Sequence, residues 1–260
     1  MTEKRTLQWP ASWLSFPYEC LVFYGGLLLF AAMCLSWSLV ASLLAFLLPK
    51  RIGVRLGRFV IMFGFRMYLR FLALSGIVEC DLSALDSLRN ERSLIIAPNH
   101  PSLIDVVLIV SRLPNAACII KANLRDQLIL GGSARLAGYI RNISQAKLIH
   151  DATREIQAGS QLLVFPEGTR TTGDSIQAFK GGFALIAKRA CAPVQMIFIE
   201  INNPFLCKGQ PLLKKPAFPL VFRARLGERF LPPGEVRHYV SRLETYCRNQ
   251  IATNDAGAPR

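Results

Sequence analysis

Two short clusters of polar residues hold the side chains that could do chemistry in this chain, and a histidine stands at the centre of the first. Residues 99–105 read Asn-His-Pro-Ser-Leu-Ile-Asp and follow an apolar run that is typical of a buried strand. Pro101 disfavours the helical conformation at His100, while Asp105 falls in the first turn of the helix that should follow. The carboxylate can then accept a hydrogen bond from one ring nitrogen and leave the other nitrogen basic. The pair is therefore a candidate general base for a hydroxyl group that the substrate supplies.

The same residues also allow a purely structural interpretation. Ser102 can cap the following helix, and Ser102 and Asp105 have the spacing of a capping box, in which the carboxylate only closes the start of the helix. His100 and Asp105 are five positions apart, so on one continuous helix their side chains would diverge. The catalytic interpretation therefore requires that His100 lies in the turn before the helix.

The second cluster has the character of an anion-binding turn. Residues 165–170 read Phe-Pro-Glu-Gly-Thr-Arg and also follow a candidate strand. Pro166 and Gly168 favour a turn, Gly168 lets the backbone approach a ligand, and Arg170 offers a guanidinium fork for phosphate or carboxylate. Active sites of open α/β sheets lie at the carboxyl ends of strands. We therefore expect the two clusters to form one site.

Short apolar runs alternate with helical patterns over most of the chain. The expected strands are Ser93–Ala97, Ala116–Lys121, Tyr139–Ile143, Gln161–Phe165, Val194–Ile201 and Leu220–Leu226. The expected helices are Leu103–Leu113, Asn123–Ala137, Ala152–Ala158, Phe179–Arg189 and Gly234–Gln250. Strands that alternate with helices predict an α/β fold with a mostly parallel sheet flanked by helices. The polar stretch Ser83–Glu91 is expected to be a loop or a short helix.

The N-terminal part of the chain has the composition of a membrane segment. From Leu21 to Pro49 there is no charged residue, and a spanning helix needs about 20 apolar residues. We expect either one tilted helix or a hairpin that is bent near Gly25-Gly26. A signal peptide has a shorter apolar region that begins nearer the N-terminus, and an ordinary buried helix is also shorter. The sequence therefore predicts a helix or hairpin that is inserted into a membrane.

Basic residues follow this segment directly. They are Lys50, Arg51, Arg55, Arg58, Arg66 and Arg70. The positive-inside rule places this flank and the remainder of the chain on the cytoplasmic side of the membrane. The arginines share one side of a helix that is otherwise apolar, which suits a helix lying among lipid headgroups. A solvated face on an ordinary surface helix is the alternative.

The overall composition also suits a chain in which a membrane-proximal segment precedes a separate domain. Hydrophobic residues make up 52% of it, yet its formal net charge is +14, and this combination suits contact with anionic lipid. A nucleic-acid binder would need its basic residues in a groove with interleaved aromatic rings, whereas many of them belong to the membrane-proximal segment. The sparse carboxylates form no metal-ligand pattern, so no metal is expected. We expect membrane-inserted and interfacial helices in residues 1–80, an α/β domain in residues 81–252 and a frayed tail in residues 253–260.

Taken together, the two clusters resemble the motifs of the glycerolipid acyltransferase superfamily, which includes the 1-acylglycerol-3-phosphate acyltransferases. The first motif of that family, Asn-His-x4-Asp, corresponds to residues 99–105, and its third motif, Phe-Pro-Glu-Gly-Thr-Arg, corresponds to residues 165–170. The segment Phe179-Lys180-Gly181-Gly182 is similar to the family's Phe-Lys-x-Gly segment. The resemblance runs from about Leu94 to Ile201.

The resemblance implies an activity and roles for individual residues. It implies that His100 is the general base, that Asp105 orients it, and that a fatty acyl group passes from a thioester to the hydroxyl of a lipid. The donor would be acyl-CoA or acyl carrier protein, with no further cofactor. The residues implied to bind the substrate are Lys121, Glu167, Gly168, Thr169 and Arg170. Among them, Arg170 would hold a phosphate group, with Lys121 as a second contact.

The sequence departs from the family pattern in the parts that would read the acceptor. Asn123 stands where the family usually has glutamate, the second motif at residues 138–144 has Arg141 three positions early, and the fourth motif at residues 192–196 lacks its second proline. Lysophosphatidic acid is the first candidate acceptor, and a lipid without phosphate, such as a lyso-aminolipid or a specialised lipid, is the second. A non-catalytic membrane-surface protein on this fold is a further alternative, against which the intact His100 and Asp105 argue.

Overall fold

The computed structural model describes residues 12–121, 131–171, 176–232 and 234–257, without the side chains of residues 12–15, 121 and 254–257. Within these ranges, one seven-stranded sheet has the order β1-β7-β6-β2-β5-β3-β4. Its strands are β1 (Val78–Asp81), β2 (Leu94–Pro98), β3 (Ala116–Lys121), β4 (Ile140–Asn142), β5 (Gln161–Leu163), β6 (Val194–Ile201) and β7 (Leu220–Phe230). Neighbouring strands are parallel, except that β6 and β7 are antiparallel. The predicted α/β fold with a mostly parallel sheet is confirmed.

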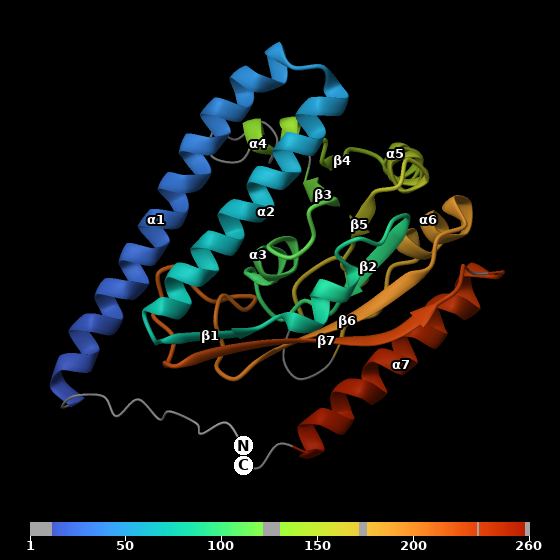
Figure 1. Cartoon of the computed structure of the whole chain (residues 1–260). Coiled ribbons are helices and arrows are strands. Elements are labelled where there is room, and N and C mark those ends of the chain that lie inside the picture. The colour runs from blue at the N-terminus through green and yellow to red at the C-terminus, as the bar shows by residue number, and fades with distance from the viewer. Residues whose placement is uncertain (1–11, 122–130, 172–175, 233, 258–260) are drawn as a thin grey trace.

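Helices cover both faces of this sheet, as Figure 1 shows. They are α1 (Ser12–Leu47), α2 (Lys50–Leu74), the 3-10 helix η1 (Ser83–Leu88), α3 (Asp105–Val110), α4 (Gly131–Leu136), α5 (Gln145–Gln157), α6 (Gly182–Ala190) and α7 (Val236–Gly257). On one face, Leu69 of α2 and Leu108 of α3 belong to the core. On the other face, Ile156, Phe183 and Leu243 of α5, α6 and α7 form a second core cluster. The central strand β2 is buried throughout, as expected for a parallel strand that is covered on both faces.

The predicted strands match the observed ones closely, and the differences have local causes. β3 and β6 have the predicted bounds. β1 is absent from the prediction because it is a four-residue edge strand in which only Val78 is buried, so it shows no alternating pattern. β7 extends to Phe230, beyond the predicted end at Leu226. Gly227 suggests a break, but a Cβ there would lie 2.6 Å from Cε2 of Phe198, so the strand requires glycine at this position.

Two helices are longer than predicted. α5 begins at Gln145 rather than at Ala152, and the Ser144 hydroxyl caps it by accepting a hydrogen bond from the Lys147 N–H at 3.4 Å. α7 continues to Gly257, past the start of the expected frayed tail at Thr253. The helix expected over 123–137 falls partly outside the described residues, which include its end as α4.

α1 is one continuous helix that includes Gly25 and Gly26, so the alternative of a hairpin bent at these glycines is not formed. The chain reverses at Pro49 instead, and α2 runs back beside α1 (Figure 1). Among the described residues, the stretch Phe16–Leu47 is the one helix that is long and apolar enough to cross a membrane. Large apolar side chains such as Leu28 and Phe46 are exposed on it.

Arg58 corrects the expected basic face of α2, because it points into the protein. Its side chain is 3% exposed. Nε donates to the carbonyl oxygen of Ala137 at 3.0 Å, Nη1 donates to the Ser160 hydroxyl at 2.8 Å, and Nη2 donates to Glu155 at 2.6 Å. The expected stripe is therefore interrupted at its centre, and Arg58 attaches α2 to the α/β domain.

The N-terminal half of α1 contacts the β6–β7 connection, by which we mean residues 202–219. The rings of Phe23 and Phe205 lie edge to face with centroids 6.2 Å apart. The Lys215 ammonium forms an ion pair with Glu19 at 2.5 Å. A second contact joins α1 to α4 farther along the helix. α1 is therefore packed against the domain at two separate places.

Candidate active site

Asn99 fixes the point at which the chain leaves the sheet before His100. Its backbone N–H donates to the carbonyl oxygen of Ile197 at 3.2 Å. Its side chain then continues the pairing of β2 with β6, since Nδ2 donates to the carbonyl oxygen of Ile199 at 3.0 Å and Oδ1 accepts the Ile199 N–H at 2.7 Å. The side-chain amide thus imitates one more residue of strand and positions the turn that carries His100.

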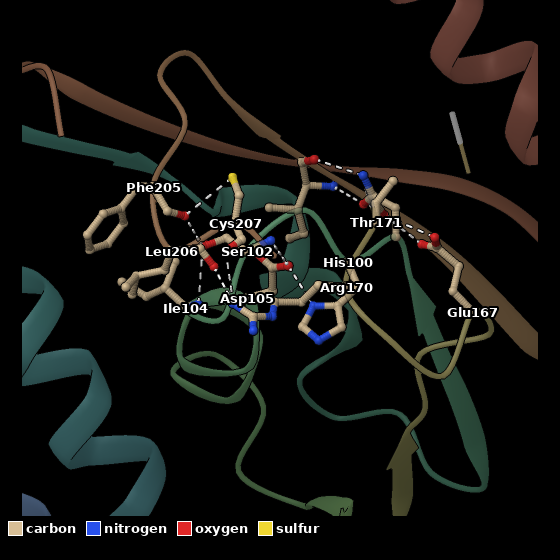
Figure 2. Close-up of polar contacts among 12 residues, drawn as sticks. His100, Ser102, Ile104, Asp105, Glu167, Arg170, Thr171, Phe205, Leu206 and Cys207 are labelled. Atoms are coloured by element: carbon tan, nitrogen blue, oxygen red, sulfur yellow. Dashed lines mark hydrogen bonds and ion pairs between the residues drawn. The ribbon is translucent and has the colours of Figure 1, made fainter. Parts of the chain in front are cut away.

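His100 and Asp105 are in direct contact in this turn (Figure 2). Nδ1 of His100 lies 2.9 Å from Oδ2 of Asp105, and their side chains are 12% and 0% exposed. Because a carboxylate oxygen only accepts, Nδ1 carries the shared hydrogen and Nε2 is left as the basic nitrogen. The ring of Phe165 stacks on the imidazole with centroids 3.7 Å apart. The geometry expected for a general base is therefore present.

Asp105 has the contacts expected from both the catalytic and the capping interpretation. The same Oδ2 accepts the backbone N–H of Ser102 at 2.9 Å, as in a capping box. Helix α3 begins at Asp105 itself, with Ile104 as N-cap and no side-chain cap, so Ser102 does not cap a helix that starts at Leu103. The Ser102 hydroxyl accepts the backbone N–H of Ile104 at 3.4 Å and donates to the carbonyl oxygen of Phe205 at 2.5 Å. Asp105 therefore holds both the start of α3 and the imidazole.

Burial raises the pKa of the Asp105 carboxyl above its ordinary value, and this is the largest influence on it. Hydrogen bonds from His100 and from the Ser102 N–H, together with the charges of His100 and Arg170, act in the opposite direction. Its second oxygen, Oδ1, is buried and has no hydrogen-bond partner among the residues that the structure describes. A carboxylate in such surroundings is stabilised by a positive charge beside it. A positive charge on the adjacent imidazole would therefore stabilise the ionised form of Asp105.

The second cluster is tied to the first through the backbone. The N–H of Thr171 donates to the carbonyl oxygen of His100 at 2.8 Å. Glu167 is buried and accepts hydrogen bonds from the Thr171 hydroxyl at 2.8 Å and from the Gln177 N–H at 3.0 Å. Figure 2 shows Glu167 on the far side of Thr171 from His100. Glu167 thus shapes the loop from within.

Arg170 reaches the first cluster and is held by backbone oxygens. Its Nη1 donates to the carbonyl oxygens of Leu206 at 2.8 Å and Cys207 at 3.1 Å (Figure 2). Its charge acts on Asp105, so the two predicted clusters do come together. The two bonds use both hydrogens of Nη1. The edge formed by Nε and Nη2 is the part of the guanidinium that could take an anion.

The remaining predicted binding residues have different environments. Gly168 is exposed with a φ of +68°, a backbone conformation that favours glycine. A Cβ there would lie 2.8 Å from Nζ of Lys180, whose flexible side chain would have to move. Thr169 is half-buried beside it. The backbone of Lys121 ends β3, while its side chain lies outside the described residues. Asn123, at the altered third position of that segment, lies outside them as well.

The β6–β7 connection supplies site contacts that the sequence motifs did not indicate. The carbonyl oxygens of Phe205, Leu206 and Cys207 hold Ser102 and Arg170. Every residue type offers a carbonyl oxygen, so no side-chain pattern marks this segment. A positive φ of 51° at Leu206, uncommon for leucine, is visible only in the folded chain. The stacking of Phe165 on His100 is likewise tertiary, although Phe165 itself stands inside a recognised motif.

Two further observations concern Arg141 and the potential metal-ligating side chains. Arg141, from the altered second motif, lies on the edge strand β4, with β5 and β3 between it and β2. No group of three or more potential metal-ligating side chains gathers within the described part of the chain. What the described residues bring together is a carboxylate-oriented imidazole beside a guanidinium.

Comparisons with known proteins point in one direction. Residues 80–200 match the family described as Acyltransferase. The lyso-ornithine lipid O-acyltransferase of Pseudomonas aeruginosa is 33% identical over 109 residues, which are 40% of this chain and 42% of that protein. The 1-acyl-sn-glycerol-3-phosphate acyltransferase beta of Homo sapiens is 27% identical over 199 residues, which are 70% of this chain and 66% of that protein. The chain thus spans less than two thirds of the length of these curated relatives.

A solved structure has the same fold. The 1-acyl-sn-glycerophosphate (LPA) acyltransferase PlsC from Thermotoga maritima superposes with a TM-score of 0.67 over 95% of this chain and 99% of that chain, at 20% sequence identity. At this identity the likeness concerns the fold alone. Together with the matching family and the similar sequences, it confirms the resemblance that the motifs indicate.

Proposed function

On the premise that residues 80–200 are an acyltransferase domain of the glycerolipid type, we propose that this protein transfers a fatty acyl group from an acyl thioester to the hydroxyl of a lysophospholipid. The first candidate acceptor is 1-acylglycerol-3-phosphate. The observation that carries the proposal is the contact of 2.9 Å between His100 and Asp105 at the carboxyl end of β2. This geometry suits a base for a hydroxyl that the acceptor supplies.

The proposed reaction needs a base, an acceptor and an activated acyl group. Nε2 of His100 takes the proton of the acceptor hydroxyl while the hydroxyl oxygen attacks the thioester carbonyl carbon. Asp105 stabilises the imidazolium that forms. The tetrahedral intermediate then collapses, the C–S bond breaks, the new ester stays on the acceptor, and the imidazolium returns the proton to the leaving thiolate. Acyl-CoA or acyl carrier protein provides the thioester, so no further cofactor takes part.

Arg170 is the proposed contact for the anionic group of the acceptor. The carbonyl oxygens of Leu206 and Cys207 hold Nη1 and so restrict the guanidinium before a ligand arrives. The edge of Nε and Nη2 can then form two parallel hydrogen bonds to phosphate, a geometry that a lysine cannot reproduce. Lys121 is a second proposed contact, and its support is the motif correspondence alone.

A lyso-aminolipid is the second candidate acceptor. A relative that is 33% identical carries the name lyso-ornithine lipid O-acyltransferase. Ornithine has a carboxylate, which a guanidinium also binds through two parallel hydrogen bonds. The displaced arginine of the second motif, at Arg141, fits an acceptor that differs from lysophosphatidic acid.

Acyl-transfer assays of Arg170→Lys distinguish the two acceptors. A charge-assisted hydrogen bond contributes roughly 1.5–3 kcal/mol, and about 1.4 kcal/mol corresponds to tenfold. We therefore expect kcat/KM for lysophosphatidic acid to fall about tenfold or more, while slow thioester hydrolysis by water is largely unchanged. Arg237→Lys, at an exposed arginine of α7, is the matched control, and the melting temperature reports the fold. If the wild type acylates lyso-ornithine lipid at least as well as lysophosphatidic acid, and Arg170→Lys leaves the rate with lysophosphatidic acid unchanged, the site does not read phosphate and the aminolipid takes precedence.

The proposed location is a membrane, with the catalytic domain on its cytoplasmic face. The stretch Phe16–Leu47 supports membrane insertion by its length and composition. Lys50, Arg51 and Arg55 follow it directly, and such a flank favours the cytoplasmic side. Membrane lipids are therefore the proposed surroundings of α1 and the source of the acceptor.

A further inference from the structure

Four arginines from three parts of the fold lie close enough to act on one another beside α2, and two of them pair with the carboxylate of Asp86. Arg66 of α2 has Nη2 3.9 Å from Oδ1 of Asp86, and Arg112, just after α3, has Nη1 3.4 Å from Oδ2. Arg89 follows η1, and its N–H donates to the carbonyl oxygen of Asp86 at 3.2 Å. Arg70 lies one helical turn beyond Arg66 on α2. One acidic side chain thus faces an excess of guanidinium groups.

The ion pairs with Asp86 do not balance this charge. The side chain of Asp86 is 46% exposed, and both distances exceed the roughly 2.8 Å of a charge-assisted hydrogen bond. Nε of Arg66 is buried without a hydrogen-bond partner in the described part of the protein. Burial, followed by the charges of Arg112, Arg89 and Arg70, lowers the pKa of Arg66, and Asp86 only partly offsets this. At Arg66, the repulsion from neighbouring arginines therefore exceeds the attraction of Asp86.

A second acidic residue on which Arg112 acts, Asp81, has hydrogen-bond partners of its own. Asp81 accepts hydrogen bonds from the hydroxyl of Ser83 at 2.7 Å and from its N–H at 3.3 Å. Among charged groups, Arg223 acts on Asp81 more strongly than Arg112 does. Asp81 therefore leaves the excess positive charge around Asp86 in place.

Apolar side chains flank the arginines on the same helix. Phe63 and Met67 are exposed, and they stand three residues before Arg66 and Arg70 respectively, which makes each a neighbour of an arginine on the surface of α2. Phe71 is also exposed and lies four residues after Met67, so it continues the apolar row. An anion bound at the arginines would therefore have an apolar surface directly beside it. An inorganic anion gains nothing from contact with apolar side chains, whereas the hydrocarbon chains of a lipid can pack against them.

We propose that Arg66, Arg89 and Arg112, with Arg70 at the rim, bind the phosphate group of an anionic phospholipid of the surrounding membrane. Guanidinium groups match phosphate oxygens in paired hydrogen bonds, and the exposed apolar residues of α2 contact the lipid chains. Asp105 begins α3 and Arg112 follows its end, so this site and the candidate active site lie at opposite ends of that helix. The site goes beyond the proposed acyl transfer and does not depend on it.

Thermal unfolding of the full chain in a neutral detergent tests this site without catalysis. Dihexanoyl phosphatidylglycerol is the anionic probe, dihexanoyl phosphatidylcholine has the same chains without net charge, and sodium phosphate supplies the free anion. A ligand that binds only the folded state raises Tm. At equal concentrations, we expect phosphatidylglycerol to raise Tm and neither phosphatidylcholine nor sodium phosphate to do so. Arg89→Gln and Arg112→Gln should each reduce this rise, and together they should abolish it.

Two more variants sharpen the comparison, each measured against its own Tm without lipid. Arg237→Gln removes an exposed arginine of α7 and should leave the rise unchanged. Asp86→Asn removes the competing carboxylate and should enlarge the rise, although it also removes two ion pairs. An equal rise in wild type and the Arg89/Arg112 double variant, a smaller rise in Asp86→Asn, or the same rise with phosphatidylcholine or sodium phosphate would overturn the proposal.

Discussion

At the scale of single residues, one carboxylate oxygen has two functions. Oδ2 of Asp105 accepts hydrogen bonds from the Ser102 N–H and from Nδ1 of His100, each at 2.9 Å. The hydrogen bonds that the catalytic and the capping interpretations require therefore meet at one atom. A variant that removes the whole side chain would lose the helix start and the base orientation together. The two functions separate only when the hydrogen bonds are kept and the charge is removed.

Asp105→Asn makes that change. The amide oxygen can take the place of Oδ2, so we expect the melting temperature to change little. A neutral amide no longer stabilises the imidazolium, and a positioned base contributes about 10²–10⁴-fold, so we expect kcat to fall by at least about a hundredfold. His100→Ala should show a comparable loss of acyl transfer. A variant that melts early but retains its turnover would return Asp105 to a structural role alone.

The sequence predicts the contacts of this site only where they are local. His100 and Asp105 could be paired in advance because Pro101 and the start of a helix determine their geometry within seven residues. Arg170 could be placed near them because both clusters follow parallel strands. Its attachment to Leu206 and Cys207 could not be predicted, since backbone oxygens of a distant connection leave no trace in residue type.

At the scale of elements, Arg58 attaches α2 to the domain. The guanidinium bonds the end of the α4 turn, α5 and the residue before β5. Arg58→Met keeps the apolar stem but leaves Glu155 and Ser160 without this partner. Because Glu155 is partly exposed, we expect a loss of about 3 kcal/mol, the lower end for a broken buried pair. Denaturant unfolding measures it, and Arg237→Met on the surface of α7 is the control. An unchanged midpoint would show that α2 is attached by apolar packing alone.

The ion pair of Arg58 with Glu155 makes the stability of the folded state depend on pH in a predictable direction. Burial acts to raise the pKa of Glu155, but hydrogen bonds from Ser160 and Arg58 and the charge of Arg58 outweigh it and hold the pKa below its ordinary 4.5. The contribution of the pair is then complete above that value and is lost as the pH falls through the pKa of the folded state. The stability difference between wild type and Glu155→Gln should therefore shrink below about pH 4.5. A difference that stays constant into acid would contradict the ion pair.

Elements were predictable where pattern and length agree. β3 and β6 are buried apolar runs bounded by polar or turn residues, so their ends follow from the sequence. β1 is too short for a pattern, and it exists because β7 pairs with it in parallel. The basic face of α2 was expected from helical spacing alone, which cannot show that the domain presents Glu155 to one of its arginines.

At the scale of the whole molecule, α1 combines an exposed apolar surface with two places of contact to the domain. Carbonate washing of membranes should therefore leave the wild-type protein in the pellet. A lysine at the centre of a spanning helix costs about 2.5–3.5 kcal/mol. Leu28→Lys combined with Leu43→Lys should thus release the protein, because both side chains are exposed and make no core contact. Leu231→Lys, an equally exposed change on the domain, should not. Recovery of the wild type in the soluble fraction would contradict the membrane proposal.

The contact between α1 and the β6–β7 connection also determines when during synthesis the site can be completed. Glu19 and Lys215 are 196 residues apart in the chain, and Tyr24 and Leu213 are 189 apart. Translation runs from the N-terminus, so α1 has long left the ribosome when its partners are made. The same late connection supplies the oxygens that hold Arg170. A nascent chain stalled before β6 therefore already contains both motifs but lacks the carbonyl oxygens that hold Arg170, so the site is completed only after the β6–β7 connection is made.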